Sequence, residues 1–436
     1  MITIAEFAQR RERFMAQMDA NSMAIFPAAS EVTRSRDTEF PFRQDSDFHY
    51  LCGFAEPDAV LVFTPSEENK VTLFCRPKDK EMEIWTGRRV GPDKAVDLLA
   101  IDCAHSLLTI DETLLNLING HQTLYYSGGV YSDFDQKVTS WVSQLRRAPK
   151  KGYKAPVITK DARTLVDEMR LFKSDQEIEV MSKACQISSE GHKKAMQFTQ
   201  PGVTEYQVEA QLHHHFAMNR GRYPAYGTIV GGGNNANILH YTQNSDELKD
   251  GDLLLIDSGC ELDGYAADIT RTFPVNGRFS APQAELYQLV LDAQLAALAL
   301  YTPGKTLKIA GDKAIEVITQ GLVKLGLLTG EVSQLIEEGA FKAFYMHGLG
   351  HWLGLDVHDV GDYRLENKAQ NREFEPGMVL TVEPGLYVDM DADVPAQYKG
   401  IGIRIEDDIL ITKQGHRVLT CDVPKTIKQI EALMAP

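Results

Sequence analysis

Two stretches of the sequence, "GDLLLIDSG" (251–259) and "GMVLTVEPG" (377–385), share one frame. Each has a glycine, a strand of aliphatic residues, a carboxylate six positions after that glycine, and then a second glycine. Asp257 and Glu383 occupy equivalent places in the two copies. Duplicated halves with matched acids suit a site for two cations. The repeat therefore predicts a domain made of two related halves.

The first copy continues into a hairpin. In "IDSGCELDGYAADIT" (256–270), Asp263-Gly264 is a strong two-residue turn. If these two residues form the loop, Asp257 lies opposite Thr270, and Asp268 falls on the same face within roughly 7–8 Å of Asp257. Two acids set this close repel each other unless they are protonated or bridged by a cation.

The second copy adds another acid. In "GIGIRIEDDILI" (400–411), alternation places Arg404 and Glu406 on one face and Ile403 and Ile405 on the other. A single strand acid would be read as a surface residue, but acids among aliphatic residues on two matched hairpins need partners. The candidate metal ligands of the two copies are Asp257, Asp268, Glu383 and Glu406.

A third stretch, "HGLGHWLGLDVHDVG" (347–361), holds three histidines and two aspartates. Such a density of histidine and aspartate suggests a metal site, but the stretch alone does not tell which side chain is a ligand. Asp356 and Asp359 are interpreted as turn acids that support their neighbours. A run of histidines at 213–215 lies in a helical stretch, where successive side chains point about 100° apart and cannot converge on one ion.

Composition excludes several classes of function. The chain has 436 residues and a formal charge of −16, which argues against electrostatic binding of nucleic acid or anionic lipid. No uninterrupted run of about 18 apolar residues occurs, so no membrane-spanning helix is expected. The six cysteines are scattered without a Cys-x-x-Cys pair, which is typical of reduced cysteines in a cytoplasmic protein.

The sequence predicts two domains, 1–172 and 173–436. Ser174 and Glu177 form a capping box that starts a long helix at the opening of the second domain, and Thr204 starts the next helix in the same way. The first domain alternates short apolar runs with helical stretches, which indicates an α/β domain. These runs are "SMAIFPA" (22–28), "AVLVFTP" (59–65) and "VTLFCRP" (71–77).

Several long, ordered blocks resemble the dinuclear-metal "pita-bread" peptidases, and among them the Xaa-Pro aminopeptidase (aminopeptidase P) family. The resemblance covers nearly the whole chain. It implies an α/β amino-terminal domain followed by an α+β pseudo-twofold "pita-bread" catalytic domain. Besides 347–361, the blocks are "RQDSDFHYLCGFAEPDAVLVF" (43–63), "EIWTGRRVG" (83–91), "HYTQN" (240–244), "IDSGCELDGYAADITRTFPVNG" (256–277), "VLTVEPGLY" (379–387) and "GIGIRIEDD" (400–408).

The resemblance implies a metalloexopeptidase that hydrolyses the amino-terminal Xaa-Pro bond of peptides through a bridging hydroxide on two divalent metal ions. Glu383 would also take the proton of the attacking water. The ligand set is hard and rich in oxygen, which favours Mn²⁺ over a soft metal and leaves Zn²⁺, Co²⁺ and Fe²⁺ as alternatives. The implied metal ligands are Asp257, Asp268, His351, Glu383 and Glu406.

By the same resemblance, the remaining site residues contact the substrate or support the ligands. His347 would line the pocket, His358 would donate to the scissile carbonyl, and His240 would contact the substrate from the other side. Tyr387 and Arg404 would support the metal site from behind. The glycine-rich run "GGGNN" (231–235) is expected to form a flexible loop bordering this site.

Two residues of the first domain, Trp85 and Asp37, match family motifs near the mouth of the active site and would act across a subunit interface. This implies a homo-oligomer, either a dimer or a tetramer. Three alternatives stay open: a prolidase restricted to Xaa-Pro dipeptides, a metal-free relative that serves as a binding protein, and a methionine aminopeptidase. The "EIWTGRRVG" block favours the aminopeptidase over the prolidase, five intact ligands argue against a metal-free relative, and the long first domain argues against a methionine aminopeptidase.

Overall fold

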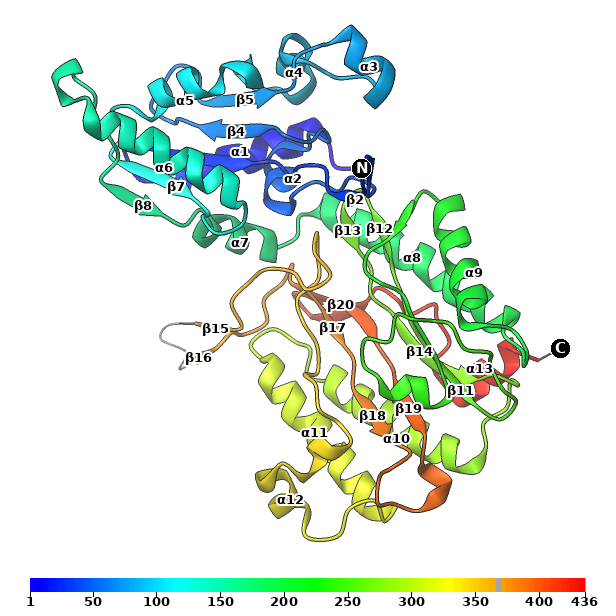
Figure 1. Cartoon of the computed structure of the whole chain (residues 1–436). Coiled ribbons are helices and arrows are strands. Elements are labelled where there is room, and N and C mark those ends of the chain that lie inside the picture. The colour runs from blue at the N-terminus through cyan, green and yellow to red at the C-terminus, as the bar shows by residue number, and fades with distance from the viewer. Residues whose placement is uncertain (366–369, 436) are drawn as a thin grey trace. The chain divides into compact units, whose positions relative to one another are not determined.

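The computed structural model describes residues 1–365 and 370–435. The chain divides into two units between Arg170 and Leu171, and Met1 belongs to the second, carboxy-terminal unit (Figure 1). The sequence places the boundary two residues further along the chain. Among the described residues, no helix has both the length and the apolar character needed to cross a membrane.

The amino-terminal unit is built on a six-stranded mixed sheet with the strand order β6-β5-β4-β1-β7-β8. β1 pairs antiparallel with β4 and parallel with β7. The strands of the sheet are β1 (Ser22–Pro27), β4 (Val60–Phe63), β5 (Val71–Cys75), β6 (Cys103–Ser106), β7 (Thr123–Tyr126) and β8 (Ile158–Lys160), and β2 (Thr33–Ser35) and β3 (Thr38–Glu39) form a separate hairpin. The helices are α1 (Ile4–Gln17), α2 (Ser46–Cys52), α3 (Lys80–Thr86), α4 (Pro92–Leu99), α5 (Ile110–Ile118), α6 (Ser132–Arg147) and α7 (Arg163–Leu171). The three apolar runs of the sequence are therefore confirmed as strands.

Alternation along β1 divides the core of this unit between the two faces of the sheet. Ile25 packs in a buried cluster with Leu114 of α5 and Trp141 of α6. The next residue, Phe26, points to the opposite face, where its ring lies 5.3 Å from that of Phe14 on α1. Helices on both faces of a largely buried sheet are the α/β architecture expected from the sequence.

The first half of the carboxy-terminal unit starts with α8 (Asp175–Phe198) and α9 (Glu205–Met218), whose predicted capping boxes at Ser174 and Thr204 are both present. Two small sheets follow, with the orders β10-β11-β14 and β13-β12-β9. Their strands are β9 (Tyr223–Pro224), β10 (Ile229–Gly232), β11 (Leu253–Asp257), β12 (Cys260–Leu262), β13 (Tyr265–Ala266) and β14 (Thr270–Pro274). A 3-10 helix, η3 (Gly233–Asn237), follows β10.

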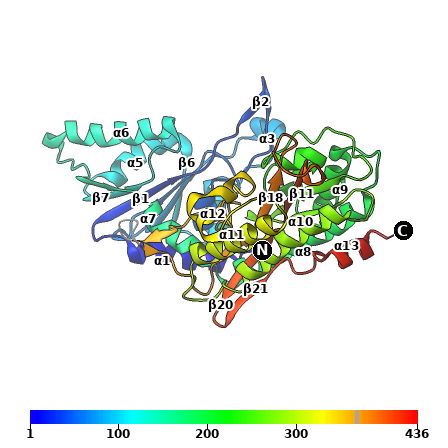
Figure 2. The same ribbon diagram turned by 90° about the horizontal axis from the view of Figure 1, so that it is seen from below.

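The second half repeats this plan. β17 pairs with β20, and β18 pairs with β19. α10 lies beside α11 in both views (Figure 2), and it packs on these strands. The elements are α10 (Ala281–Leu298), α11 (Leu307–Lys324), α12 (Val332–Glu338), β15 (Arg364–Leu365), β16 (Gln370–Asn371), β17 (Val379–Val382), β18 (Gly385–Val388), β19 (Ile401–Arg404), β20 (Asp407–Thr412), β21 (Gly415–Val418) and α13 (Ile427–Leu433). The α+β pseudo-twofold arrangement is confirmed.

The predicted hairpin register is confirmed, since Asp257 pairs with Thr270 in the first half. The two strands of the hairpin are interrupted at the acids. In the first half the break follows Asp257, and in the second half it lies between Val382 and Gly385, which places Glu383 in it. Regular pairing therefore ends at the acid in each half.

We predict that Gly259→Ala destabilises the carboxy-terminal unit. Gly259 lies at the first break, and a Cβ there would stand 1.7 Å from the carbonyl oxygen of Ala267. Overpacking against backbone costs about 3 kcal/mol at the upper end of its usual range, so calorimetry should show a clearly lower Tm. The control is Gly311→Ala within α11, where the nearest atom, Leu349 Cβ, is 3.8 Å away. An equal Tm for both variants would show that the break tolerates a side chain.

Candidate metal centre

The predicted ligands line one cavity of about 540 Å³ in the carboxy-terminal unit. Asp257, Asp268 and Glu406 are buried, and His351 and Glu383 are half-buried. The cavity is also lined by His240, His347, His358 and Arg404, together with Tyr226, Gly227, Ile229, Leu239, Thr242, Gly348, Gly350 and Val357. The structure therefore brings together five predicted ligands that are spread over residues 257–406 of the sequence.

His351 lies at the centre of this cluster. One ligand atom from each of Asp268, His351 and Glu406 lies within 4.8 Å of the other two. The Nε2 atom of His351 is 3.4 Å from both Asp268 Oδ2 and Glu383 Oε1. Nδ1 of the same ring is 3.0 Å from the carbonyl oxygen of Trp352, to which a protonated Nδ1 donates. This bond leaves Nε2 directed at the carboxylates, where it can bind a metal ion once its proton is lost.

Asp257 and Asp268 converge on one hydroxyl. The Tyr226 oxygen lies 2.7 Å from Asp257 Oδ1 and 2.6 Å from Asp268 Oδ1. A phenol carries a single proton, so it can donate to only one of the two carboxylates at a time. Arg404 donates to the other oxygen of Asp257, whereas the basic group nearest Asp268 is His351. This geometry fits a bound cation between the two acids.

The charges of the cluster point the same way. Burial raises the pKa of Glu383 to about 7, and it raises the pKa of Glu406 well above its usual range. Burial also raises the pKa of Asp257. For His351 burial lowers the pKa, but the hydrogen bond and charge of Asp268 outweigh it and raise that pKa to about 9. Burial raises the pKa of Asp268 too, but the hydrogen bond and charge of His351 outweigh it and lower that pKa. Metal binding to such a cluster would release the protons that its members hold.

Arg404 ties the acids to a further tyrosine. Its Nη2 donates to Asp257 Oδ2 at 2.6 Å, and its Nη1 donates to the Tyr387 hydroxyl at 3.0 Å. Its Nε donates to Thr270 Oγ1 at 3.1 Å, and that hydroxyl in turn donates to Glu406 Oε2 at 2.7 Å. One buried guanidinium therefore fixes acids from both halves of the unit.

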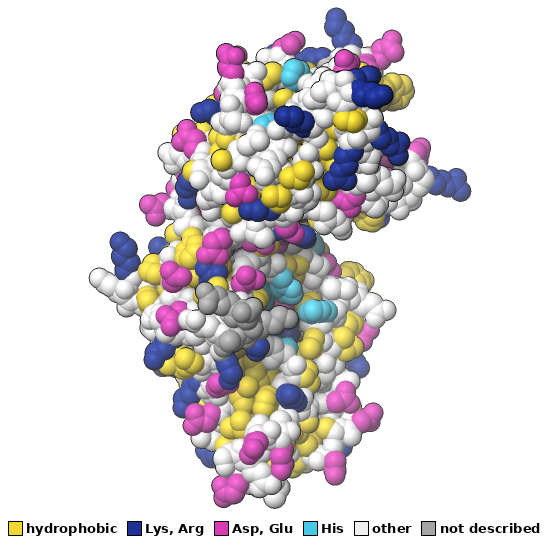
Figure 3. Space-filling view, turned by 90° about the vertical axis from the view of Figure 1, so that its left-hand side faces the viewer, with side chains coloured by type: hydrophobic (Ala, Val, Ile, Leu, Met, Phe, Trp, Pro, Cys, Tyr) yellow, Lys and Arg dark blue, Asp and Glu magenta, His cyan; other side chains and the backbone are white. Residues whose placement is uncertain are grey.

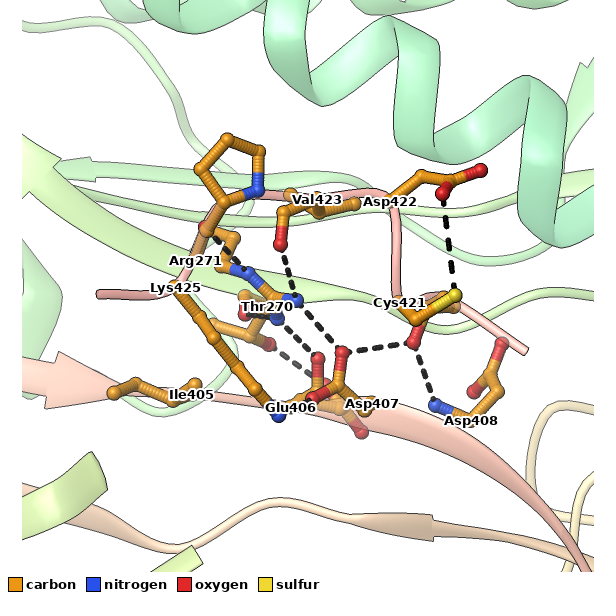
Figure 4. A network of polar contacts seen from close by, with 12 residues as sticks. Thr270, Arg271, Ile405, Glu406, Asp407, Asp408, Cys421, Asp422, Val423 and Lys425 are labelled. Atoms are coloured by element: carbon orange, nitrogen blue, oxygen red, sulfur yellow. Dashed lines mark hydrogen bonds and ion pairs between the residues drawn. The ribbon is translucent and has the colours of Figure 1, made fainter. Parts of the chain in front are cut away.

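A second layer of charged groups holds the backbone of Glu406. Figure 4 shows Arg271 and Lys425 directed at Asp407, at 2.7 and 2.8 Å. Arg271 also donates to the carbonyl oxygen of Glu406 at 2.5 Å. Both Arg271 and Asp407 are completely buried. Because a buried charge that loses its partner is costly, this network fixes the position of the Glu406 carboxylate.

The other histidines differ in their surroundings. His347 is half-buried, and its Nδ1 donates to the carbonyl of Gly348 at 2.8 Å while its Nε2 lies 2.9 Å from the Tyr387 hydroxyl. Burial lowers the pKa of His347 to about 4, so the ring is neutral. His358 is exposed, and its ring lies 4.3 Å from that of His351. His240 is exposed as well, and Figure 3 shows histidine side chains gathered on one face of this unit.

Comparison with known proteins agrees with this geometry. Residues 179–413 match metallopeptidase family M24. The chain belongs to metallopeptidase family M24. Residues 7–125 match the domain described as "Aminopeptidase P, N-terminal domain". The M24 match spans both halves of the carboxy-terminal unit and includes all five predicted ligands.

The M24 chain also has relatives along almost its full length. It is 49% identical over 435 residues to the Xaa-Pro aminopeptidase of Escherichia coli, covering 99% of this chain and 98% of that one. It is 34% identical to human Xaa-Pro aminopeptidase 3, covering 98% and 85%. Among solved structures, Pseudomonas aeruginosa aminopeptidase PepP matches with a TM-score of 0.98 at 48% identity, covering 99% and 98%. Zn-substituted E. coli aminopeptidase P in complex with product matches with a TM-score of 0.97 at 49% identity, with the same coverage.

Sequence reasoning missed several residues of this M24 site. Tyr226 bonds two of the acids, yet it lies in a stretch without a strand or helix pattern. Thr381 accepts a hydrogen bond from the backbone of His351 and donates to Glu383, which the alternation of β17 could have indicated. Asp359, interpreted as a turn acid, accepts from the Asp356 backbone at 3.4 Å and also forms a buried ion pair with Lys173 at 3.0 Å. That pair anchors the segment that carries His358.

Two predicted residues belong to the amino-terminal unit of the M24 chain. Trp85 lies on α3, and its side chain is 84% exposed. Asp37 lies between β2 and β3 and is also exposed. α3 has no buried residue at all. The substrate-binding roles that the resemblance assigns to Trp85 and Asp37 stay predictions.

We predict that Asp257→Asn weakens metal binding more than it weakens folding. The amide keeps the shape of the side chain but removes a charge that faces Asp268 and the cavity. Metal content by elemental analysis should fall after dialysis, while the circular dichroism spectrum stays that of wild type. Asp250→Asn, at an exposed turn, is the control. Unchanged metal affinity in Asp257→Asn would argue against Asp257 as a ligand.

We predict that alanine variants of His351 and His358 lose activity for different reasons. His351→Ala removes a nitrogen from the metal cluster, so metal content should fall and excess Mn²⁺ should restore part of the activity. His358→Ala leaves the cluster intact, so metal content should stay normal while kcat falls by roughly 10²–10³, as for a lost oxyanion donor. Elemental analysis with kcat across a Mn²⁺ titration separates them. Metal loss in His358→Ala alone would reverse the two assignments.

Proposed function

We propose that this protein is a metalloexopeptidase that removes the amino-terminal residue from peptides with proline in the second position. The observation that carries the peptidase chemistry is the buried cluster of four carboxylates around His351. The Xaa-Pro preference is supported by the 49% identity to the E. coli Xaa-Pro aminopeptidase over 99% of this chain. His240 and His358 line the same cavity and are exposed, so a peptide can reach them from solvent.

The donor set fits two divalent ions, since four carboxylates balance their charge. Asp257, Asp268, His351, Glu383 and Glu406 would hold them, and the oxygen-rich set favours Mn²⁺. When bound, the ions would lower the pKa of a coordinated water and so supply a nucleophile for the scissile carbonyl at neutral pH. Proton transfer, stabilisation of the oxyanion and contacts with the peptide are assigned to side chains of the carboxy-terminal unit.

Glu383 is the group we assign to proton transfer. Its Oε1 accepts a hydrogen bond from Thr381 at 3.3 Å, which fixes the carboxylate toward the cavity. It can take the proton of the attacking water and return it to the leaving proline nitrogen. His358, at the exposed edge of the cavity, donates to the oxyanion that forms at the carbonyl. His240 contacts the peptide from the opposite wall.

His347, Tyr387 and Arg404 form a chain that keeps the pocket in place. The protonated Nδ1 of His347 donates to Gly348, so its Nε2 accepts from the Tyr387 hydroxyl. Tyr387 in turn accepts from Arg404, which holds Asp257. A neutral His347 can border the proline without bringing another positive charge to a site built for cations.

The homo-oligomer, the cytoplasmic location and the part that the amino-terminal unit plays in substrate access stay predictions. They follow from the family resemblance and the scattered cysteines of the sequence. Size-exclusion chromatography with light scattering tests the oligomer directly. A monomeric protein with full activity would contradict a role for Trp85 across a subunit interface.

A peptide assay tests the proposed function. With added Mn²⁺, the protein should release the first residue from a tripeptide Xaa-Pro-Yaa and show less activity on the dipeptide Xaa-Pro. A matched tripeptide Xaa-Ala-Yaa should be a poor substrate. Cleavage of the dipeptide alone would indicate a prolidase instead. A protein without bound metal and without activity on any of the three would be a metal-free relative.

Glu383→Ala should abolish turnover and lower metal occupancy together, because it removes a ligand and the proposed base. A general base contributes roughly 10²–10⁴ to the rate, so kcat should fall by at least that factor. The control is Glu375→Ala, an exposed acid before the same strand. Near-normal turnover in Glu383→Ala would contradict the mechanism.

A further inference from the structure

One wall of the cavity holds no predicted metal ligand. Residues 226–242, called the cavity wall from here on, contribute Tyr226, Ile229, Leu239 and His240 to its lining. This segment comprises β10, η3 and the turn that follows them. The expectation of a flexible loop at 231–235 is wrong in part, since these residues end a strand and form a 3-10 helix. Something must therefore fix the cavity wall in this form.

Glu205, at the start of α9, makes four hydrogen bonds to this region. Its side chain is completely buried. Oε1 accepts from the Gly232 backbone at 2.8 Å and from Asn235 Nδ2 at 3.0 Å. Oε2 accepts from the Tyr241 hydroxyl at 2.8 Å and from the Asp246 backbone at 2.9 Å. One carboxylate thus joins the middle of the cavity wall to Tyr241 near its end and to Asp246 beyond it.

The surroundings of Glu205 make this arrangement sensitive to change. Glu205 forms no ion pair with any residue in the described part of the chain, so these four donors alone stabilise its buried charge. Removing the carboxylate would leave the backbone N–H groups of Gly232 and Asp246 and the Tyr241 hydroxyl without this acceptor, while Asn235 Nδ2 keeps its bonds to Tyr241 and Asp246. A glutamine there keeps the shape but has a single acceptor oxygen.

Two further residues lie one and two turns along the same face of α9. Glu209 Oε2 accepts from Asn244 Nδ2 at 3.0 Å. That asparagine donates to the carbonyl of Thr228 at 2.9 Å and accepts from the Val230 backbone at 3.0 Å. His213 Nε2 lies 2.8 Å from Thr228 Oγ1. Residues spaced by four share one helix face, so these contacts follow the wall from end to end.

The far side of the cavity wall is fixed as well. A Cβ at Gly402 of β19 would lie 2.5 Å from the carbonyl oxygen of Ala236, so the backbone of η3 touches β19 directly. Asn237 Nδ2 also donates to the Val388 carbonyl at 3.3 Å. The wall is therefore held between α9 and the strand that carries Arg404. Movement of the wall toward or away from the metal ligands is resisted from both sides.

We infer that Glu205, Glu209 and His213 are positioning residues, which set the distance between the cavity wall with His240 and the metal cluster and thereby determine how tightly the peptide is bound. The inference rests on the proposed function for its substrate. It also gives a role to the first histidine of the 213–215 run, which the sequence indicated only as a partly exposed helix face. His214 is exposed and takes no part.

The test compares Glu205→Gln and Glu205→Ala with Glu179→Gln, an exposed acid on α8. In metal-loaded protein well below its Tm, kcat/KM on Xaa-Pro-Yaa should fall by roughly tenfold to a hundredfold, as expected for a displacement of about 1 Å. The fall should be mainly in KM, with metal content unchanged and the glutamine variant retaining more activity than the alanine variant. A lower Tm with wild-type KM in both variants would reduce Glu205 to a structural residue and overturn the inference.

A second pair of variants, His213→Ala and His214→Ala, tests the inference if Glu205→Ala does not fold. His213→Ala should raise KM, and His214→Ala should not. Hydrogen exchange across residues 228–246 should be faster in His213→Ala and in Glu205→Gln than in wild type. This readout needs no substrate, so an inactive wild type would refute the proposed function while the exchange still decides the inference. Unchanged exchange in both variants would overturn it.

Discussion

Like charges in one buried cavity repel each other, and the carboxy-terminal unit encloses four carboxylates in a single cavity. Within the described part of the chain, Arg404 is the one arginine or lysine that bonds any of them, and it bonds only Asp257. One guanidinium cannot balance four acids at low dielectric. The cluster is therefore stable only with bound protons or with cations, and Nε2 of His351 is directed at the same place.

The fold meets this constraint by repeating one device. In each half a strand of buried, mostly aliphatic residues ends at an acid, where the regular pairing is interrupted. The layer behind the acids is charged but fully paired, with Arg271 and Asp407 completely buried. Rigid support of this kind is what a metal site needs to hold its ligands at fixed distances. The wall that meets the peptide is supported separately, from α9.

Local rules reached much of this from the sequence. The Asp263-Gly264 turn sets the register of its hairpin, so the pairing of Asp257 with Thr270 could be predicted from chain geometry alone. The capping boxes of α8 and α9 are local as well. The metal role of His351 required the family resemblance, because three histidines in fifteen positions are equivalent until the fold selects one.

Contacts between segments that are distant in the sequence could not be predicted from it. Thr270 bonds Glu406 across the two halves, 136 residues apart, and no local pattern indicates that meeting. The run at 231–235 was expected to be flexible because glycine and asparagine favour loops. It became ordered because Glu205, far from it in the sequence, accepts its backbone and side-chain donors. Burial of polar groups is decided by such tertiary partners.

Four carboxylates in one cavity should bind two divalent cations. Isothermal titration of EDTA-dialysed protein with MnCl₂ measures this binding. We expect saturable binding of two ions per chain. Heat changes no greater than dilution into buffer, with the protein folded throughout, would contradict it.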